Sequence, residues 1–354
     1  MKSINKTFFP ALTGYRAIAA WIIFIYHFFP FNNPKIPDFI KNVIGEFHIG
    51  VDMFFVLSGF LITYRYIDEN PINIKKYLIN RIARIYPMYL LVTILVFINF
   101  YLLNRSWNIE KTKELLLSIT MTKALFENYF FAGIAQGWTL TLEELFYFTA
   151  PFYLMMINKS RKFLLVLPVI IFIFGLSLKI IFSGNFGGFL QINIANYIFE
   201  FFAGIGLALN IKQKYYEKIN FRFFTFWGVG IILFYLMTRN YIAQHINFKN
   251  DFARAIELGL ISSLGIVPLL YGLIFENTFI QKILSSKLIV LLGKSSYIFY
   301  LIHKGFISIY FNDYISNNKL LLFLFLNVLS ILMFHYLEEP FNLYIRKKYS
   351  PKSE

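Results

Sequence analysis

The chain has 354 residues, of which 58% are hydrophobic and only 15% are charged. Soluble globular domains carry about 25% charged residues, so this composition excludes an ordinary soluble protein and indicates one that crosses a membrane. The net charge of +15 is typical of cytoplasmic loops that fix topology, and we expect no nucleic-acid partner. The absence of cysteine excludes disulfides, a cysteine nucleophile and thiolate metal sites.

Apolar stretches long enough to cross a bilayer as helices recur along the chain. They predict an all-α, polytopic membrane helix bundle with about ten transmembrane helices, at residues 8–31, 45–66, 78–103, 138–157, 162–183, 189–211, 222–239, 254–275, 289–311 and 320–344. The stretch 113–133 mixes apolar and charged residues, and we expect an interfacial or re-entrant segment there. With the N-terminus inside, 21 basic residues fall on the cytoplasmic side and ten on the outer side, which predicts two cytoplasmic termini.

The first apolar stretch contains Arg16 and His27, eleven residues apart. Eleven residues of α-helix make three turns plus about 20°, so both side chains share one face, about 16 Å apart along the axis. An arginine in a membrane helix costs about 2.5–3.5 kcal/mol, so we expect it to face a polar path or a partner rather than lipid. A histidine that burial keeps neutral can accept a proton as a general base. The alternative for His27 is a hydrogen-bonded packing residue.

His48 and Asp52 are four residues apart near the outer end of the second predicted helix, so they share a face. A metal site is one interpretation of this pair. No second acidic cluster accompanies it, however, and we expect no metal. Hydrogen-bonded packing is the other interpretation of His48.

Arg81 and Arg84 lie one turn apart at the predicted start of the third helix, on the cytoplasmic side. The positive end of that helix and the two guanidinium groups would together form a site for phosphate oxygens. The alternative is that both arginines only flank the helix and fix its topology.

Trp138, Glu143, Glu144 and Tyr147 open the fourth predicted helix at its outer end. Glu143 and Tyr147 share a face because they are four residues apart. Tryptophan is common at membrane interfaces, so this block is compatible with a topological anchor as well as with a functional site.

His303 and Lys304 lie within the ninth predicted helix, and Glu338 and Glu339 lie near the cytoplasmic end of the tenth. By the predicted topology these two acids approach the depth of Arg16. We therefore expect Arg16 to pair with Glu338 or Glu339.

Together these residues resemble the acyltransferase-3 family of integral membrane acyltransferases. The segments that carry the resemblance are, in chain order, 12–27, 50–60, 81–87, 138–147, 295–303 and 338–340. Thr13, Thr139 and Gly305 stand where the family's pattern more often has Asp, Ser and Pro, but no charged motif residue departs from it. The resemblance spans nearly the whole chain, and the order and spacing of the motifs make it specific.

The resemblance implies that residues 1–354 form a single transmembrane acyltransferase domain, without the extracellular hydrolase-like domain that many members add. Such an enzyme moves an acyl group, usually acetyl, from cytoplasmic acyl-CoA to a hydroxyl of an extracytoplasmic polysaccharide or glycolipid. The implied catalytic residues are His27 as general base, Arg16 and Glu143. The implied acyl-CoA site is formed by Arg81, Arg84 and Arg16, and the implied acceptor site by Asp52, His48, Trp138 and Tyr147.

The resemblance also implies a multi-pass protein of the cytoplasmic membrane that uses acetyl-CoA as donor substrate and holds no permanently bound cofactor. A transporter or exporter whose route is lined by Arg16 and His27 is the alternative interpretation, because polar residues inside a membrane mark either kind of path. The order of the motifs favours the enzyme.

Overall fold

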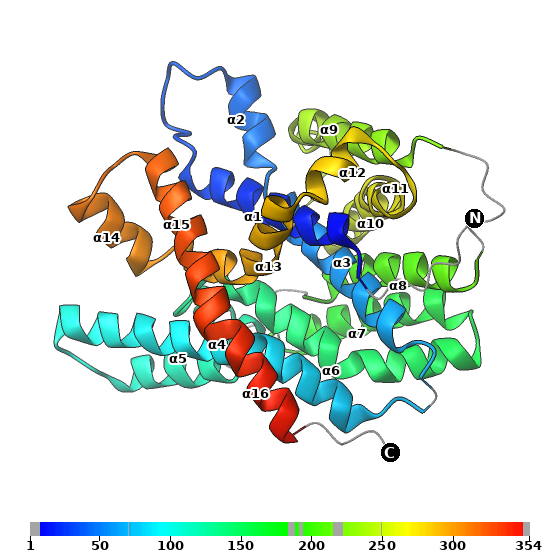
Figure 1. The fold of residues 1–354 in the computed structure, drawn as a ribbon, viewed down its shortest axis with the longest axis horizontal. Coiled ribbons are helices and arrows are strands. Elements are labelled where there is room, and N and C mark those ends of the chain that lie inside the picture. Colours follow the sequence, from blue (N-terminus) through cyan, green and yellow to red (C-terminus); the bar gives the residue numbers. More distant parts are fainter. Residues whose placement is uncertain are drawn as a thin grey trace. The chain divides into compact units, whose positions relative to one another are not determined.

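A computed structural model describes residues 8–69, 71–182, 188–190, 194–214, 222–248 and 250–349 (Figure 1). These residues fold into helices, and the β pairing among them is an isolated bridge between Phe126 and Phe189. Within these described ranges, six helical runs are long and apolar enough to cross a membrane: Pro10–Phe28, Asp38–Tyr66, Ile74–Asn104, Phe163–Ile181, Asp251–Phe275 and Lys319–Tyr349. The all-helical membrane fold is therefore confirmed, whereas the count of ten crossings and their orientation stay predictions.

The chain divides into two compact units, which we describe one at a time. Unit 1 comprises Met1–Asp68, Leu164–Pro168 and Asn196–Lys294, and unit 2 comprises Glu69–Phe163, Val169–Ala195 and Ser295–Glu354. Two helices, α7 (Phe163–Ile181) and α13 (Lys287–Ile302), have residues in both units.

Unit 1 contains helices from the first part of the chain and from a later part. They are α1 (Pro10–Phe28), α2 (Asp38–Gly45), α3 (Ile49–Tyr66), α8 (Ile198–Lys212), α9 (Phe224–Ile242), α10 (Asp251–Ile261), α11 (Val267–Phe275) and α12 (Phe279–Leu284). A π-helical turn, η6 (Ser262–Ile266), joins α10 to α11. The buried core of the unit is formed by apolar side chains of α1, α3, α8 and α11.

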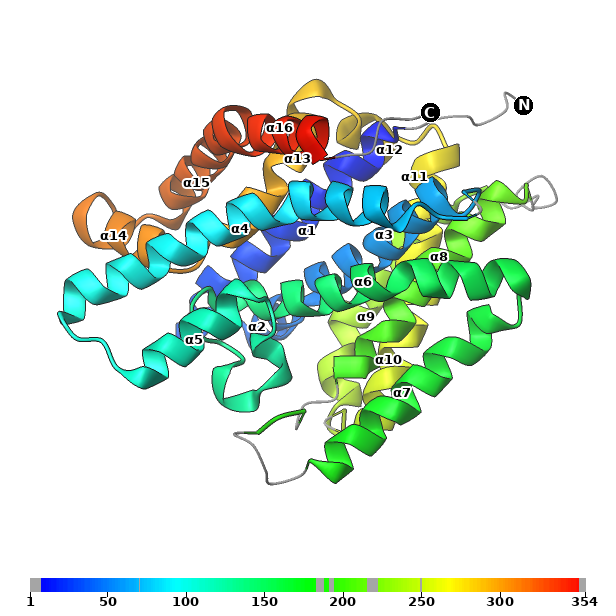
Figure 2. The same ribbon diagram turned by 90° about the horizontal axis from the view of Figure 1, so that it is seen from below.

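Glycines bring α3 and α8 into backbone contact, and the two helices lie side by side in Figures 1 and 2. A Cβ atom on Gly59 would lie 2.0 Å from the carbonyl oxygen of Phe201. A Cβ atom on Gly204 would lie 2.0 Å from the carbonyl oxygen of Val56. Small residues commonly allow membrane helices to approach this closely, so α3 and α8 form one rigid pair.

Unit 2 contains α4 (Ile74–Asn104), α5 (Ile109–Ile119), α6 (Trp138–Lys159), α14 (Phe306–Tyr314), α15 (Lys319–Met333) and α16 (Glu339–Tyr349). Three 3₁₀ turns lie between α5 and α6: η1 (Lys123–Leu125), η2 (Glu127–Tyr129) and η3 (Ala135–Gly137). A π-helical turn, η7 (Phe334–Glu338), joins α15 to α16. Helix α16 packs against α4, and the two lie side by side in both views (Figures 1 and 2).

The ninth and the sixth predicted helices differ most from the observed ones. The continuous ninth helix, 289–311, is wrong, because α13 ends at Ile302 and α14 begins only at Phe306. Gly305 between them has φ of 140°, a conformation that only glycine adopts readily, so the chain leaves the helix there. The start of the sixth predicted helix at 189 is also wrong, since α8 begins at Ile198 after the 3₁₀ turn η4 (Ile194–Tyr197).

The mixed stretch 113–133 folds into the end of α5 followed by 3₁₀ turns, not into a transmembrane helix. Lys123 anchors these turns, because its side chain is 0% exposed. Its Nζ atom donates hydrogen bonds to the carbonyl oxygens of Ala132 and Ile134. Burial lowers the pKa of Lys123 to about 7, because it removes water from the charged amino group.

Candidate active site

Helix α1 carries both Arg16 and His27 without interruption, so the spacing that predicts one shared face applies to the observed helix. Pro10 begins α1 at a position where the missing N–H of proline costs nothing. Arg16 and His27 are half-buried, and each interacts with other residues of the protein. Neither is therefore an isolated polar group on the surface of the helix.

An aromatic side chain links His27 to His48 at one end of unit 1. The ring centroid of Tyr26 lies 5.0 Å from that of His27 and 6.1 Å from that of His48. His48 Nδ1 is 3.2 Å from the carbonyl oxygen of Gly45 and 3.8 Å from Glu46 Oε2. Two of the predicted site residues, His27 and His48, are thus brought together around Tyr26.

Asp52 lies in the interior, beside Glu200 of α8. The two residues are 1% and 0% exposed, and their carboxyl groups interact directly. Carboxylates only accept hydrogen bonds, and neither Glu200 oxygen has a donor among the described residues. Asp52 and Glu200 therefore form a buried carboxyl pair, and the Arg254 guanidinium acts on both groups electrostatically.

Arg254 begins an ion network that leads back toward His48. Its Nη1 lies 2.7 Å from Glu257 Oε2, and Arg239 Nε lies 2.9 Å from Glu257 Oε1. Arg239 Nη1 then reaches Glu46 Oε1 at 3.2 Å. Two guanidinium groups thus pair with two buried acids, and the network joins α9 and α10 to the turn between α2 and α3.

Sequence reasoning named His48 and Asp52 at the edge of this network but missed its other members, Glu46, Glu200, Arg239, Arg254 and Glu257. The signal that could have found it is Glu200, an acid inside an otherwise apolar run, because an ionisable residue in a membrane helix is rarely without a role. Its partners on α3 and α10 are distant in sequence, so no spacing rule would have identified them.

In unit 2, α4 and α6 bring Arg81, Glu143 and Tyr147 together. The guanidinium carbon of Arg81 lies 5.6 Å from the ring centroid of Tyr147 and 6.0 Å from that of Tyr77. The Tyr147 hydroxyl donates to Glu143 Oε1 at 2.7 Å, which confirms the predicted shared face. The Tyr77 hydroxyl donates to the carbonyl oxygen of Tyr147 at 2.7 Å. The cluster combines a cation, a phenol and a carboxylate.

Arg84, one turn after Arg81, forms an ion pair with Glu338 of η7. Glu338 is 2% exposed, so this pair is largely buried. Glu339 instead lies 3.7 Å from His335, where both side chains are about half exposed. The predicted pairing of Arg16 with Glu338 or Glu339 concerns residues of different units and stays a prediction.

The prediction that Arg81 and Arg84 start a helix is wrong. Helix α4 begins at Ile74, and the side chain of Asn73 caps it by accepting a hydrogen bond from the Lys76 N–H at 2.9 Å. Arg81 therefore lies about 10 Å from the helix end. The partial charge of a helix terminus acts within its first turn, so the two arginines have no help from it.

The block that begins at Trp138 meets the end of α13 within unit 2. Trp138 stacks on Phe130 with ring centroids 5.1 Å apart. Gln136, just before it, donates from Nε2 to the carbonyl oxygen of Tyr300 at 3.1 Å. That same carbonyl oxygen is 2.8 Å from Nδ1 of His303, which is 0% exposed. Two of the sequence motifs, 138–147 and 295–303, thus form one packed region.

The predicted site residues divide between the two units. Unit 1 holds Arg16, His27, His48 and Asp52, and unit 2 holds Arg81, Arg84, Trp138, Glu143 and Tyr147. Within the described ranges, no three His, Asp or Glu side chains are grouped so that they could hold a metal ion.

The acyltransferase domain of the acyltransferase-3 family matches residues 9–335, more than nine-tenths of the chain. The chain belongs to the acyltransferase-3 family. All the site residues above except Glu338 and Glu339 fall within the matched range.

Curated relatives agree with this assignment. A Staphylococcus aureus (strain COL) protein named "Putative O-acetyltransferase" is 26% identical over 94% of this chain. An uncharacterized Haemophilus influenzae protein is 29% identical over 38% of the chain and 62% of its own length. A protein of Acidianus two-tailed virus named "Putative acetyltransferase" is 30% identical over 49% of both chains. The chain covers 57% of the length of the Staphylococcus aureus relative. No solved structure matches.

Proposed function

We propose that this acyltransferase-3 protein is a membrane O-acyltransferase that moves an acyl group, acetyl by preference, from acyl-CoA to a hydroxyl. The observation that carries the proposal is the acyltransferase domain over residues 9–335, within which α1 holds Arg16 and His27 on one helical face. Of the three relatives described above, two have printed names that refer to an O-acetyltransferase or an acetyltransferase.

His27 is the proposed general base. It takes the proton of the acceptor hydroxyl while the hydroxyl oxygen attacks the thioester carbonyl carbon. The new C–O bond forms and the C–S bond breaks, so coenzyme A leaves as a thiolate. The thiolate takes the proton from the His27 imidazolium, and the products are an ester and free coenzyme A. General-base catalysis of this kind contributes about 10²–10⁴-fold to a rate.

Arg81, Arg84 and Arg16 are the proposed contacts for the phosphates and thioester arm of acyl-CoA. Guanidinium groups recognise phosphate oxygens well because their donors form a planar fork. Arg81 lies over two tyrosine rings, which fixes its orientation, whereas the ion pair of Arg84 with Glu338 leaves fewer of its donors for phosphate. Arg81 is therefore the stronger candidate of the two.

The acceptor is proposed to be an extracytoplasmic polysaccharide or a lipid-linked glycan at the cytoplasmic membrane. Glu143, held by the Tyr147 hydroxyl, is suited to accept a hydrogen bond from a sugar hydroxyl, and Trp138 offers an aromatic face. His48 lies near His27 on the other side of Tyr26. Asp52 is buried against Glu200, so its proposed effect on the acceptor acts through the position of α3.

The experiment measures acetyl transfer by the full chain in lipid nanodiscs, with labelled acetyl-CoA and a fraction of cell-surface glycans. His27→Ala and His27→Gln should lower turnover by about 10²–10⁴-fold while the protein remains folded and membrane-inserted. His245→Ala is the matched control, because His245 is exposed at the end of α9. Wild-type turnover in His27→Gln would remove His27 from the mechanism. Glycan movement without consumption of acetyl-CoA would support a transporter instead.

A further inference from the structure

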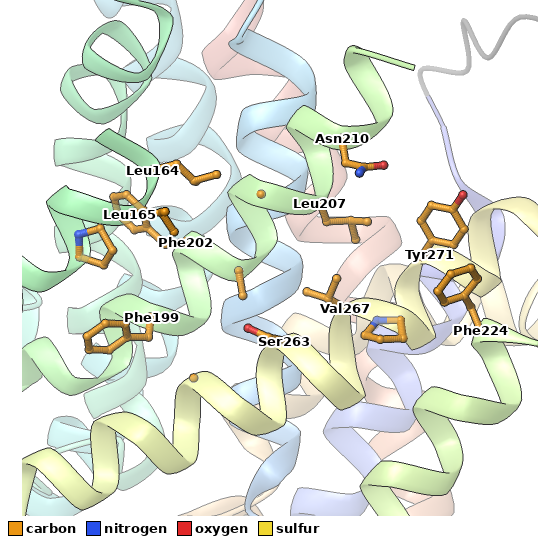
Figure 3. A pocket seen from close by; sticks show the side chains of 15 residues that line it. Leu164, Leu165, Phe199, Phe202, Leu207, Asn210, Phe224, Ser263, Val267 and Tyr271 are labelled. Carbon is orange, nitrogen blue, oxygen red and sulfur yellow. The ribbon is translucent and has the colours of Figure 1, made fainter. Parts of the chain in front are cut away.

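Unit 1 has an apolar groove of about 450 Å³ on its surface (Figure 3). Helix α8 forms one wall, and α10, η6 and α11 form the opposite wall. The start of α7 and Phe224 of α9 complete the lining. The neighbouring surface is also apolar, since Leu165, Leu260 and Leu264 are at least half exposed. In a membrane-crossing bundle such a surface meets hydrocarbon, so a chain from the bilayer can enter the groove.

Two glycines create the space inside the groove. A Cβ atom on Gly206 would meet only a Leu164 methyl at 3.8 Å, and one on Gly259 would meet only the Phe199 Cβ at 4.0 Å. These contacts differ from those of Gly59 and Gly204, which are pressed against backbone atoms. Glycine within a helix costs about 0.5–1 kcal/mol relative to alanine. Helix packing does not require glycine at position 206 or 259. The small size of these two residues instead leaves the groove open.

The length of the groove matches one leaflet. Along α8 its lining runs from Phe199 to Asn210, and eleven residues of helix span about 16 Å. The hydrocarbon core of a bilayer is about 30 Å thick, so one leaflet contributes about 15 Å. A single hydrocarbon chain lying along the groove would therefore extend from one interface to near the middle of the membrane.

Polar and basic groups mark one end of the groove. The side chains of Asn210 and Tyr271 lie at this end in Figure 3. Asn210 Oδ1 is buried and has no hydrogen-bond partner among the described residues. Lys212 and Lys214 follow within one turn of Asn210, and Arg222 comes two residues before Phe224.

Among the residues that the structure describes, two acidic groups lie near this end, and each is bonded to a partner other than Lys214 or Arg222. Asp68 pairs with Lys212 at 2.5 Å. Glu276 accepts hydrogen bonds from the N–H groups of Phe223 and Phe224 and so caps α9. Lys214 and Arg222 are both exposed. Within the described part of this end, these two exposed cations supply positive charge that suits a phosphate.

We propose that the groove binds one molecule of an anionic glycerophospholipid. One acyl chain lies along α8 over Gly206 and Gly259, and the headgroup phosphate is held near Lys214 and Arg222. The amide of Asn210 hydrogen-bonds to the polar backbone of the lipid where the chain enters. This site is separate from the residues assigned to acyl transfer, and its test does not depend on the proposed function.

The first experiment measures lipid that remains bound to the full chain in native mass spectrometry after transfer from phosphatidylglycerol nanodiscs. Gly206→Leu places a side chain in the hollow and should abolish the one-lipid adduct. Gly230→Leu is the matched control, because Gly230 is an exposed helix glycine outside the groove with nothing within 4 Å of a Cβ atom. Thermal unfolding of both variants reports whether they fold. An adduct that persists in folded Gly206→Leu protein overturns the site.

The second experiment tests the headgroup. Lys214→Gln and Arg222→Gln should each weaken phosphatidylglycerol binding about fivefold, as expected for a basic residue near an anionic phosphate. Binding of phosphatidylcholine should be weaker than that of phosphatidylglycerol and unaffected by either change. Equal retention of both lipids by the wild type would show ordinary hydrocarbon filling and would reject an anionic-lipid site. Preferential retention of a prenyl phosphate over phosphatidylglycerol would reject the glycerophospholipid as the occupant.

Discussion

Lys123 shows what a single buried amino group requires in this fold. Its side chain is 0% exposed, and its hydrogen-bond acceptors are carbonyl oxygens that carry no full charge. Two carbonyl dipoles compensate poorly for lost hydration of an ammonium ion, which is why burial lowers the pKa of Lys123 to about 7. The turns between α5 and α6 are thus held by a group that can be neutral at physiological pH.

This residue should make stability depend on pH in a defined direction. The unfolded chain keeps the ordinary lysine pKa near 10.5, so between about pH 7 and pH 10 it binds more protons than the folded protein. The free energy of unfolding should therefore rise with pH in that window, by at most about 1.4 kcal/mol per unit from this group. Lys123→Met removes the titration, so the stability of the wild type relative to the variant should increase from pH 7 to pH 10.

The measurement is chemical unfolding of the detergent-solubilised protein at a series of pH values. Lys113→Met is the control, because Lys113 is an exposed lysine of α5 whose side chain is 54% exposed. Its stability should follow that of the wild type across the range. A constant difference between wild type and Lys123→Met from pH 7 to pH 10 would contradict the assigned state of Lys123.

Side-chain contacts were predictable from sequence only where the partners are close in the chain. The bond between Tyr147 and Glu143 follows from their spacing of four residues on one helix. The ion pair of Arg84 with Glu338 joins residues 254 positions apart, and no local rule selects that partner. The proximity of Asp52 and Glu200 likewise depends on how α3 and α8 pack, which hydropathy alone does not specify.

Helix α8 uses glycine in two ways, once to allow close helix packing and once to leave space open. Gly204 allows backbone contact with α3, whereas Gly206, two residues later, faces open space. The two positions share a helix, a depth and a residue type, so they differ mainly in what surrounds them. They provide a matched pair for measuring how tightly α3 and α8 are joined.

Gly204→Ala should destabilise the protein, because its Cβ atom would lie 2.0 Å from the carbonyl oxygen of Val56 and would force α3 and α8 apart. The expected loss is about 1–3 kcal/mol, as for overpacking in a close-packed interior. Gly206→Ala should be neutral or stabilise by about 0.5–1 kcal/mol, because it only restores helix propensity. Thermal unfolding of both variants tests this, and equal effects would contradict the assigned packing.

The positions of the helices were largely predictable because hydropathy marks them, but their interruptions were not. Residues 289–311 are apolar throughout most of their length, and Gly305 is the residue that signals the break after Ile302. The start of α4 was also missed, although Asn73 is a favourable N-capping residue. Its side chain accepts a hydrogen bond from the N–H of Lys76, three positions later. Apolar composition reports what crosses a membrane, whereas caps and glycine conformations decide where a helix begins or ends.

For the whole chain, the distribution of basic residues is the property that orients the protein. The predicted topology places 21 basic residues on the cytoplasmic side and ten outside. Short loops with more Lys and Arg remain in the cytoplasm, so this bias favours two cytoplasmic termini and an even number of crossings. The six helical runs that satisfy length and apolarity are compatible with an even number but do not set the orientation.

The absence of cysteine allows a direct test of this orientation. Lys35→Cys changes an exposed residue between α1 and α2, on the predicted outer side, and Lys162→Cys changes an exposed residue before α7, on the predicted inner side. A membrane-impermeant thiol reagent should label Lys35→Cys in intact cells and Lys162→Cys only after the membrane is opened. The wild type should stay unlabelled in both conditions. Labelling of Lys162→Cys in intact cells would contradict the predicted topology. It would also contradict the proposal that acyl-CoA reaches Arg81 from the cytoplasmic side.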